Sequence, residues 1–562
     1  MSRWAALLGL SVLTFVVGTG RPAIQDADEA FYAESGREMV ASGDWITPHF
    51  NGEPRTNKPI LFYWLVALDD EIAGVSETGA RLWSGLAGVG LALLTAVIAR
   101  RWFGPGPDLV AGGVVATSLG LTRLARSALP DVPLTFFVTI AIWAATEVFG
   151  PETAPAQRRR WLWLAAVAIA LGFLTKGPVA IALPAVVLGP IVLVERWRAR
   201  RDRATAPIHP LPHSTSPLTW LDVTVAAVIL IGIAAPWFVL ATDANGGRFL
   251  RDFFVGENVD RFLTDRFNPT QPLWYYAPVI AGGLLPWSPF LLLLVGPLAN
   301  AARRRSMSAA ATRLALWALG PAAFFTASAG KQPRYIVPCL VPIAVLVARD
   351  IWRRASAARD RLLVATGVFA GLTLTALAAL AYRLAPVFRT TNPGWTPTGP
   401  LLIALSGVGV VVVAVGGRGA AKPLAWIALA GVTAMAVEAT VFWPTRPEPV
   451  EQVAAWIDRE APGATVSACG AFTRNLGYYA HVKTVVVDTD VDLPRCAEAP
   501  EASLAVLDDE TLTALERREH RTFARLLTVP YLDTARVRVG DLVRRPDPTK
   551  VRHVVLIRLS GR

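Results

Sequence analysis

Hydrophobic segments long enough to cross a lipid bilayer recur along this sequence, from its first residues to about residue 443. A helix of about 20 residues spans the roughly 30 Å of hydrocarbon in a bilayer. Hydrophobic residues make up 53% of the chain and charged residues 17%, a balance that soluble globular proteins rarely reach. The sequence therefore predicts a mainly α-helical, polytopic membrane protein. We expect about thirteen transmembrane helices, at residues 4–19, 80–99, 109–122, 132–149, 161–175, 178–195, 220–241, 276–296, 312–328, 335–348, 361–381, 400–415 and 423–443.

Arginine and lysine cluster in alternate loops between these predicted spans. Because positively charged loops stay in the cytoplasm, the clusters mark the cytoplasmic face. They are Arg100 and Arg101, then Arg158–Arg160, then Arg196, Arg198, Arg200 and Arg201, then Arg303–Arg305, then Arg349, Arg353 and Arg354, then Arg418 and Lys422. Arg3 places the N-terminus on the same side, and an odd number of spans places the residues after 445 outside. The net charge of +12 then reflects membrane orientation, so we predict no nucleic-acid partner.

An alternative for residues 4–19 is a cleaved signal peptide, since the segment is short and follows an arginine. Residues 18–21 lack the small-residue cleavage site that such a peptide needs, so we favour a membrane span.

The predicted outer face includes loops that hold most of the unusual residues. From Asp26 to Met39, polar residues mix with apolar ones at helical spacing, which predicts a helix lying on the membrane surface. Asp26 and Glu29 have the spacing of a capping box, and Asp28 falls in the first turn, where a negative charge favours the helix dipole. On residue type alone, helix formation is therefore favoured over catalysis as the explanation of these acids. These loops are residues 20–79, 123–131, 175–178, 242–275 and 329–335.

Several cations lie on this outer face, against the orientation rule. Each one alone is explained as an anchor whose charged end reaches the membrane surface. Together with the nearby carboxylates they indicate an anionic ligand at the outer leaflet, and a lipid-linked phosphate fits both the charge and the membrane depth. They are Arg123, Arg126, Lys176, Lys331 and Arg334. The long loop at residues 242–275, with Glu257 and Asn258, is predicted to be an amphipathic surface helix.

A series of short motifs covers the membrane part from end to end. The motifs are Asp28-Glu29-x-x-Tyr32-Ala33-Glu34-x-x-Arg37-Glu38-Met39, Ser42-Gly43-Asp44-Trp45, Lys58-Pro59 with Tyr63-Trp64, Leu129-Pro130-Asp131, Thr175-Lys176-Gly177-Pro178, and Gly330-Lys331-x-x-x-Tyr335. In order, spacing and topology the series resembles the polyprenyl-phosphate-sugar-dependent glycosyltransferases, in particular the aminoarabinose transferases and the dolichyl-phosphate-mannose protein mannosyltransferases.

This resemblance implies a GT-C fold, with about thirteen transmembrane helices in residues 1–445 and an extracytoplasmic α/β domain in residues 446–562. It implies transfer of a sugar, such as aminoarabinose or mannose, from a polyprenyl (undecaprenyl) phosphate donor. The acceptor would be a lipid, a protein or an envelope glycan on the outer face of the bacterial inner membrane, with inversion at the anomeric carbon.

The resemblance also assigns roles to single residues. Asp28 would be the catalytic base. The donor phosphate would be held by Lys58, Lys176, Arg334, Tyr335 and Lys331, and the acceptor side would be supported by Glu29, Tyr32, Asp131 and Arg126. Asn57 departs from the family, because the aminoarabinose transferases usually have there a glutamate that is implicated in a metal site. We therefore claim no cofactor, while a divalent metal stays open.

After Pro444 the sequence becomes charged and alternates helix-like with strand-like segments, which predicts an α/β domain. The helix-like segments are residues 450–459 and 510–525, and the strand-like ones are residues 465–469, 484–488, 504–507 and 551–558. Cys469 and Cys496 share the predicted oxidising side and could pair, although a cysteine in a strand is more often simply packed. We predict no catalytic residues here and expect the domain to shape acceptor access.

Two rival functions fit a chain of this kind. A multi-pass transporter, or a flippase of lipid-linked sugars, would place charges near the bilayer midplane and would show internal repeats. In this sequence the charges gather at one face. An oligosaccharide ligase or an accessory protein without transferase activity would keep the fold and change the reaction.

Overall fold

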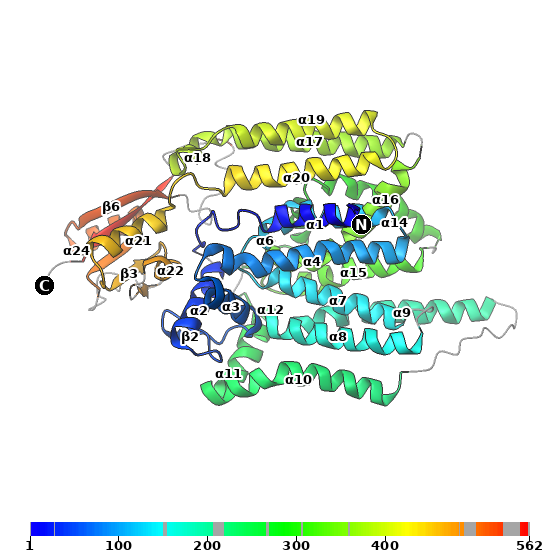
Figure 1. The fold of residues 1–562 in the computed structure, drawn as a ribbon, viewed down its shortest axis with the longest axis horizontal. Coiled ribbons are helices and arrows are strands. Elements are labelled where there is room, and N and C mark those ends of the chain that lie inside the picture. Colours follow the sequence, from blue (N-terminus) through cyan, green and yellow to red (C-terminus); the bar gives the residue numbers. More distant parts are fainter. Residues whose placement is uncertain are drawn as a thin grey trace.

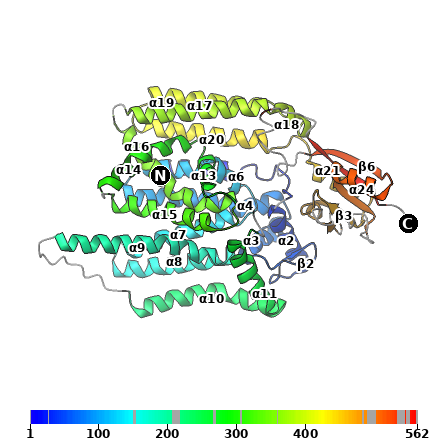
Figure 2. The ribbon, with the colours of Figure 1, turned by 180° about the vertical axis from the view of Figure 1, so that it is seen from behind.

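The computed structural model is a bundle of long helices with a small β-sheet and its helices at one end (Figures 1 and 2). It describes residues 2–26, 28–149, 154–205, 218–265, 269–304, 307–357, 360–480, 482, 484–487, 502–531, 544 and 551–559. Helices α2 and α3 lie at the same end of the bundle as the sheet (Figure 1), and this end is called the sheet end below.

The first half of the bundle runs from α1 to α10. Its elements are α1 (Ser2–Phe15), α2 (Asp28–Ser42), β1 (His49–Phe50), β2 (Glu53–Pro54), α3 (Leu61–Ala73), α4 (Glu77–Phe103), α5 (Pro107–Thr117), α6 (Leu119–Ala125), α7 (Asp131–Val148), α8 (Pro155–Lys176), α9 (Val179–Thr205) and α10 (Trp220–Asn245).

The second half runs from α11 to α20. Its elements are α11 (Arg248–Arg251), the π-helix η1 (Asp252–Asp260), α12 (Arg261–Leu263), α13 (Tyr276–Gly283), the 3-10 helix η2 (Ser288–Leu291), α14 (Leu292–Arg304), α15 (Ala309–Ala327), the 3-10 helix η3 (Pro333–Cys339), α16 (Leu340–Ala355), α17 (Arg361–Arg383), α18 (Ala385–Thr391), α19 (Thr398–Gly416) and α20 (Ala421–Val441).

Every segment predicted to cross the membrane falls on helical structure. Among the described residues, 8 helices are long and apolar enough to cross a bilayer, or up to 9 if α5 and α6, bent by 62° at their junction, form one span. The number of crossings therefore stays a prediction. The predicted span at residues 276–296 is wrong as one continuous helix, because the chain there forms α13, η2 and the start of α14.

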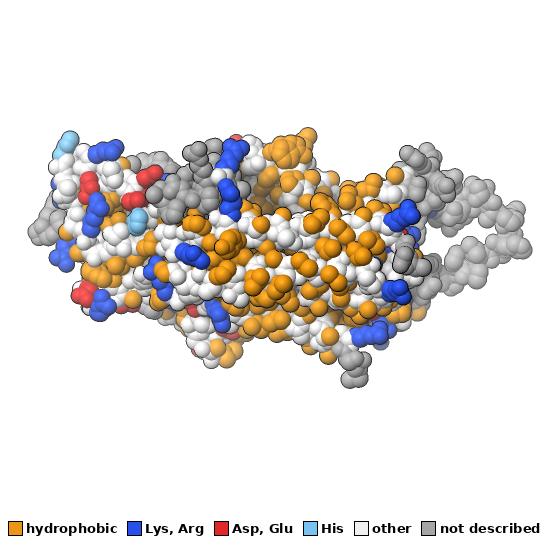
Figure 3. Space-filling view, turned by 90° about the horizontal axis from the view of Figure 1, so that it is seen from above, with side chains coloured by type: hydrophobic (Ala, Val, Ile, Leu, Met, Phe, Trp, Pro, Cys, Tyr) orange, Lys and Arg blue, Asp and Glu red, His pale blue; other side chains and the backbone are white. Residues whose placement is uncertain are grey.

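The outer surface of the bundle is apolar. On α10, Val228 and Val239 are 63% and 65% exposed, and on α19 Val412 is 62% exposed. Figure 3 shows hydrophobic side chains over the middle of the bundle and Lys and Arg toward both ends. An apolar surface of this extent indicates contact with lipid, because exposing it to water would be unfavourable. Helices suit a lipid environment because their backbone polar groups are hydrogen-bonded internally. The chain is a multi-pass membrane protein.

The C-terminal part is a mixed sheet with the strand order β4-β3-β5-β7-β6. Strands β4 and β5 pair with β3 in parallel, whereas β7 pairs antiparallel with both β5 and β6. Its elements are α21 (Pro449–Glu460), β3 (Val466–Cys469), α22 (Leu476–Ala480), β4 (Thr484–Val487), β5 (Leu504–Asp508), α24 (Asp509–Glu519), β6 (Ala524–Tyr531) and β7 (Arg552–Arg558).

Two predictions for this part need correction. The helix predicted at residues 510–525 is too long: α24 ends at Glu519, the next residue, His520, has a left-handed backbone with φ of 50°, and β6 begins at Ala524. Cys469 is buried in β3 and is disulfide-bonded, which contradicts the expectation that it is simply packed. Cys496 lies outside the described residues.

Candidate active site

Two acids and two cations form a continuous chain at the sheet end. Lys176 donates to Asp131 with 2.6 Å between Nζ and Oδ1. On the other side of Asp131, Arg334 Nε lies 3.8 Å from Oδ2, and Arg334 also donates through Nη2 to Asp28. The structure thus brings together four residues that the sequence places in four separate loops.

Local structure explains why these side chains meet. Asp131 is in the first turn of α7, where a helix favours negative charge, and Lys176 is in the last turn of α8, where it favours positive charge. Gly177 then turns the chain with φ of +81°, and a Cβ on it would lie 2.7 Å from the Phe253 ring. A glycine is therefore required there by both backbone conformation and space.

A second cluster is centred on Glu257, in the π-helix η1. Lys58 Nζ lies 3.0 Å from Glu257 Oε2, and Arg261 Nη2 lies 2.6 Å from the same oxygen. Asn57 donates its side-chain amide to Glu257 Oε1 at 3.3 Å. The sequence prediction for this loop assigned no site residue, so Glu257 and Arg261 were missed. The available signal was Arg261 itself, an arginine on the predicted outer face, and π-helical turns often mark functional sites.

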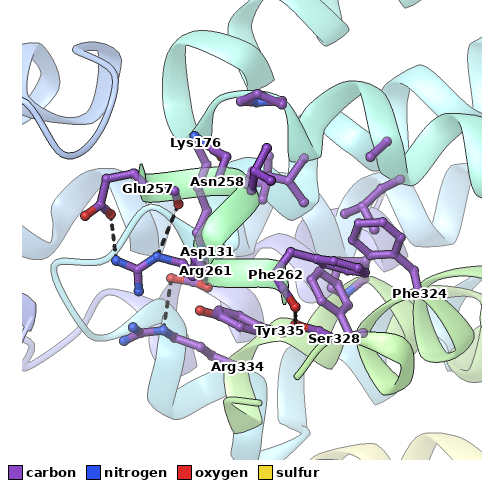
Figure 4. Close-up of a pocket in the computed structure, with 18 of the residues that line it drawn as sticks. Asp131, Lys176, Glu257, Asn258, Arg261, Phe262, Phe324, Ser328, Arg334 and Tyr335 are labelled. Carbon is purple, nitrogen blue, oxygen red and sulfur yellow. Dashed lines mark hydrogen bonds and ion pairs between the residues drawn. The ribbon is translucent and has the colours of Figure 1, made fainter. Parts of the chain in front are cut away.

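Both clusters face an elongated cavity of about 360 Å³ between α7, α9, α15 and η3. One end of the cavity is polar and the rest is apolar. The polar end is lined by Lys58, Asp131, Lys176, Glu257, Arg261, Arg334 and Tyr335, and the apolar walls include Leu134, Val179, Leu183, Phe262, Phe324 and Phe325. Figure 4 shows Arg261, Glu257 and Arg334 at one side of this cavity and Phe324 at the other. A cavity of this kind matches a lipid with an anionic headgroup.

A smaller, polar pocket of about 80 Å³ adjoins the cavity at its cationic end. It shares Lys58, Asp131 and Arg334 with the cavity and extends to Asp28, Tyr32 and Arg55. Tyr32 is buried and its ring packs 5.1 Å from Phe62, centre to centre, so it forms a rigid wall. The sequence prediction also missed Arg55, because no motif contains it.

Two ionisable groups of this site have shifted pKa values. Burial would raise the pKa of Asp28, but the positive charges of Arg334, Arg474 and Arg55 outweigh it, and the pKa is lowered. Asp28 is therefore a carboxylate at neutral pH. Burial lowers the pKa of Lys58 to about 8, although the charge of Glu257 opposes the shift.

Glu29 does not face the pocket but holds the segment that presents Asp28. It pairs with the fully buried Arg81 at 2.7 Å, and its Oε1 accepts from the backbone N–H of Ala128 at 2.7 Å. Arg81 in turn donates to three carbonyl oxygens, those of Thr19, Pro22 and Ala23. The pair connects the chain before α2 to the loop before α7, so it positions Asp28 and Asp131 together.

The predicted capping box at the start of α2 is wrong. Asp26 does not accept from the first turn of α2. Its carboxylate accepts from the backbone N–H groups of Thr473 at 3.2 Å and Arg474 at 2.7 Å, in the C-terminal part.

Besides Glu29, two residues predicted for the site line neither pocket. Lys331 is buried and donates to the carbonyl oxygens of Gln271 at 3.1 Å and Ser328 at 2.9 Å. Arg126 is buried against Glu438 at 3.1 Å inside the bundle. Both side chains have partners within the protein, and the structure places neither of them at the two pockets.

The donor set around Asn57 does not fit a metal ion. The oxygens of Glu257 already accept from Asn57, Lys58 and Arg261, and two of these partners are cations that would repel a metal. Among the residues that the structure describes, no group of three or more His, Cys, Asp and Glu side chains is placed to hold one.

The fold is that of the GT-C class of membrane proteins. In a structural comparison the chain is similar to ArnT from Cupriavidus metallidurans bound to undecaprenyl phosphate, with a TM-score of 0.71 and 22% sequence identity over 99% of both chains. The family model for dolichyl-phosphate-mannose-protein mannosyltransferases matches residues 23–243.

Curated relatives define the family more closely. The undecaprenyl phosphate-alpha-4-amino-4-deoxy-L-arabinose arabinosyl transferase of Edwardsiella ictaluri is 33% identical over 394 residues, 69% of this chain and 67% of the relative. The transferase of the same name from Pseudomonas paraeruginosa is 33% identical over 393 residues, which is 67% of this chain and 65% of that relative. The chain belongs to this family of GT-C proteins.

Proposed function

We propose that this protein transfers a sugar from a polyprenyl-phosphate donor to an acceptor at the sheet end of the bundle. The observation that carries the proposal is the cavity of about 360 Å³, which has an apolar body and a cationic end beside Asp28 and Asp131. A polyprenyl chain fits the apolar body, and its phosphate fits the cations. Undecaprenyl phosphate carrying 4-amino-4-deoxy-L-arabinose is the first donor to test, because it appears in the names of the relatives.

The residues divide the chemistry between the two parts of the site. The acceptor attacks the anomeric carbon while the bond from that carbon to the donor phosphate oxygen breaks, and the electron pair leaves with polyprenyl phosphate. Lys176, Lys58 and Arg261 would stabilise the charge on the departing phosphate, and Tyr335 lies beside Lys176, with Nζ 5.2 Å from the ring centre. Attack from the opposite side, where Asp28 lies, would give inversion.

Asp28 is suited to a particular kind of acceptor. Its lowered pKa keeps it ionised and able to accept a hydrogen bond, but gives it little driving force to remove a proton from an alcohol. It would therefore orient the acceptor nucleophile and receive its proton when that group is itself acidic.

We further propose the orientation that the arginine clusters imply. The N-terminus would be cytoplasmic, and residues 446–562 would form a domain outside the inner membrane, on the same side as the site. The reaction would need no resident metal, since Asn57, Lys58 and Arg261 surround Glu257.

The function is tested with purified protein in lipid nanodiscs. Labelled sugar on undecaprenyl phosphate is supplied with an envelope extract, and the labelled products are identified by mass spectrometry. Donor-dependent transfer is expected from the native protein and loss of at least about 100-fold from Asp28→Asn. Glu53→Gln, an exposed acid in β2 at the same end, is the matched control. Full transfer by Asp28→Asn would refute the mechanism, and no transfer by the native protein to any fraction would refute the function.

A further inference from the structure

A second large cavity lies between α1, α19 and α20 and is called the side groove below. Its volume is about 650 Å³, which is larger than that of the cavity at the candidate active site. Figure 1 shows α19 and α20 at one side of the bundle and α8 and α10 at the other. No residue lines both cavities, and among the residues that the structure describes no acidic side chain lines the side groove. The side groove is therefore a separate place, suited to binding and not to acid–base chemistry.

The body of the side groove is apolar and open to the membrane. Leu13 of α1, Leu402 of α19 and Val432 of α20 line it, and all three are exposed. Gly431 lets α20 approach α1 so closely that a Cβ on it would lie 2.8 Å from Leu10, a kind of packing that is typical of membrane bundles. A hydrocarbon chain of the surrounding bilayer can therefore lie in this groove.

The end of the side groove nearest the sheet is polar, and hydrogen bonds fix its shape. The Asn392 side chain accepts from the backbone N–H of Thr445 at 3.1 Å and donates to the carbonyl oxygen of Trp443 at 3.2 Å. The backbone N–H of Gly394 donates to the Thr445 hydroxyl at 3.1 Å. All four residues line the groove. Because α20 ends and α19 begins here, this polar end lies at the depth of lipid headgroups.

Two arginines lie at this polar end. The guanidinium carbon of Arg21 is 4.3 Å from the centre of the Trp443 ring, and that of Arg389 is 5.4 Å from the centre of the Trp395 ring. Both tryptophans line the side groove, and both arginines are exposed. Within the described part of the chain, neither arginine has an acidic side chain at ion-pair distance. One such arginine is an ordinary interface anchor, but two on the tryptophans of one groove give its polar end a positive charge.

These features together indicate the chemistry of the ligand. Guanidinium groups bind phosphate oxygens through paired hydrogen bonds, and the apolar body accommodates an acyl chain. The indole N–H groups of Trp395 and Trp443 are buried without an acceptor among the described residues, whereas buried donors usually have one. A lipid phosphate or ester oxygen is an acceptor at this depth. A lipid with net negative charge is favoured over a zwitterionic one, whose own ammonium group would oppose the two cations.

We propose that the side groove binds an anionic phospholipid of the surrounding bilayer, with an acyl chain between α1, α19 and α20 and its phosphate at Arg21 and Arg389. The proposal goes beyond the proposed function, because this lipid is neither donor nor acceptor and lies apart from both pockets. The bound lipid bridges α1 to α19 and α20, so it stabilises the bundle near the C-terminal sheet.

The test uses the full chain, purified and delipidated in detergent. Phosphatidylglycerol or phosphatidylcholine with the same acyl chains is added, and lipid retention is measured by native mass spectrometry together with the thermal unfolding midpoint. Phosphatidylglycerol is expected to bind at least about tenfold more tightly, and Arg21→Gln combined with Arg389→Gln should remove that preference. The matched control is Arg349→Gln, at an arginine that lies 5.0 Å from the Phe103 ring and outside the groove.

A second pair of variants tests the groove without changing its charge. Ala439→Trp, at an exposed position that lines the groove, should block retention of phosphatidylglycerol, whereas Val412→Trp, at an exposed position of α19 that does not line it, should not. Lys176→Met alters the donor cavity and should leave this retention unchanged. Equal affinity for the two lipids, or full retention by the arginine double variant or by Ala439→Trp, would overturn the inference. Loss of retention in Lys176→Met alone would overturn it too, and none of these results depends on sugar transfer.

Discussion

Replacing Lys176 by methionine tests the assignment of the donor phosphate site most directly. The ammonium group lies at the junction of the cavity and the polar pocket, 2.6 Å from Asp131. A charge-assisted hydrogen bond to a phosphate contributes about 1.5–3 kcal/mol, and about 1.4 kcal/mol corresponds to a tenfold change in affinity. Lys176→Met is therefore expected to weaken binding of undecaprenyl phosphate about 10- to 150-fold, measured by titration in nanodiscs.

Lys331 offers a control, because it is a buried lysine in the neighbouring part of the sheet end. Its ammonium group contacts the carbonyl oxygens of Gln271 and Ser328 and does not line the cavity. Lys331→Met is expected to reduce stability by about 2–4 kcal/mol through two lost hydrogen bonds, while donor affinity changes less than about threefold. Equal losses of donor affinity in the two variants, or none in Lys176→Met, would refute the assignment.

Three further predictions concern pH, the buried ion pair and the turn after α8. Burial lowers the pKa of Lys58 to about 8, and a bound phosphate would raise that pKa again. Donor affinity should therefore be constant below pH 8 and fall by up to about tenfold per pH unit above it. A donor affinity that stays constant up to pH 9.5 would contradict this prediction. Arg81→Met leaves Glu29 buried without the partner that lies 2.7 Å away and should lower the free energy of unfolding by about 3–5 kcal/mol. Replacing both residues by apolar ones should restore much of that stability, as measured by thermal unfolding. Gly177→Ala places a Cβ 2.7 Å from the Phe253 ring at a φ of +81°. The substitution should lower the free energy of unfolding by about 1–2 kcal/mol and raise the KM for the donor. Unchanged kinetics would show that this turn does not shape the cavity.

Some features of this protein follow from the sequence because they depend on local composition. Long hydrophobic segments predict that the chain lies in a membrane, since a segment of sufficient length and apolarity partitions into lipid. The helix that starts at Asp28 was predicted from the spacing of its apolar residues, and the C-terminal α/β pattern follows from alternating segments. The family motifs identified Asp28, Lys58 and Lys176, and the structure places all three at the two adjoining pockets.

Other features depended on contacts between distant parts of the chain. Asp26 and Glu29 have the spacing of a capping box, but Asp26 bonds to Arg474, which lies 448 positions away in the sequence. Spacing along a helix cannot reveal a competing partner of this kind. Arg474 itself carries no motif, so its position beside Asp28 becomes visible only when the C-terminal sheet docks.

The sequence by itself determined that lipid surrounds the chain, where the helices lie and that several cations gather on one face, because hydrophobicity and charge act residue by residue. It treated Lys176, Lys331, Arg126 and Arg334 alike, as cations on one face. Only the tertiary structure separated them: Lys331 and Arg126 are satisfied by carbonyl oxygens and Glu438, whereas Lys176 and Arg334 line the cavity. The physical reason is that a buried charge takes whichever partner the fold brings near, and that partner decides whether the charge remains available for a ligand.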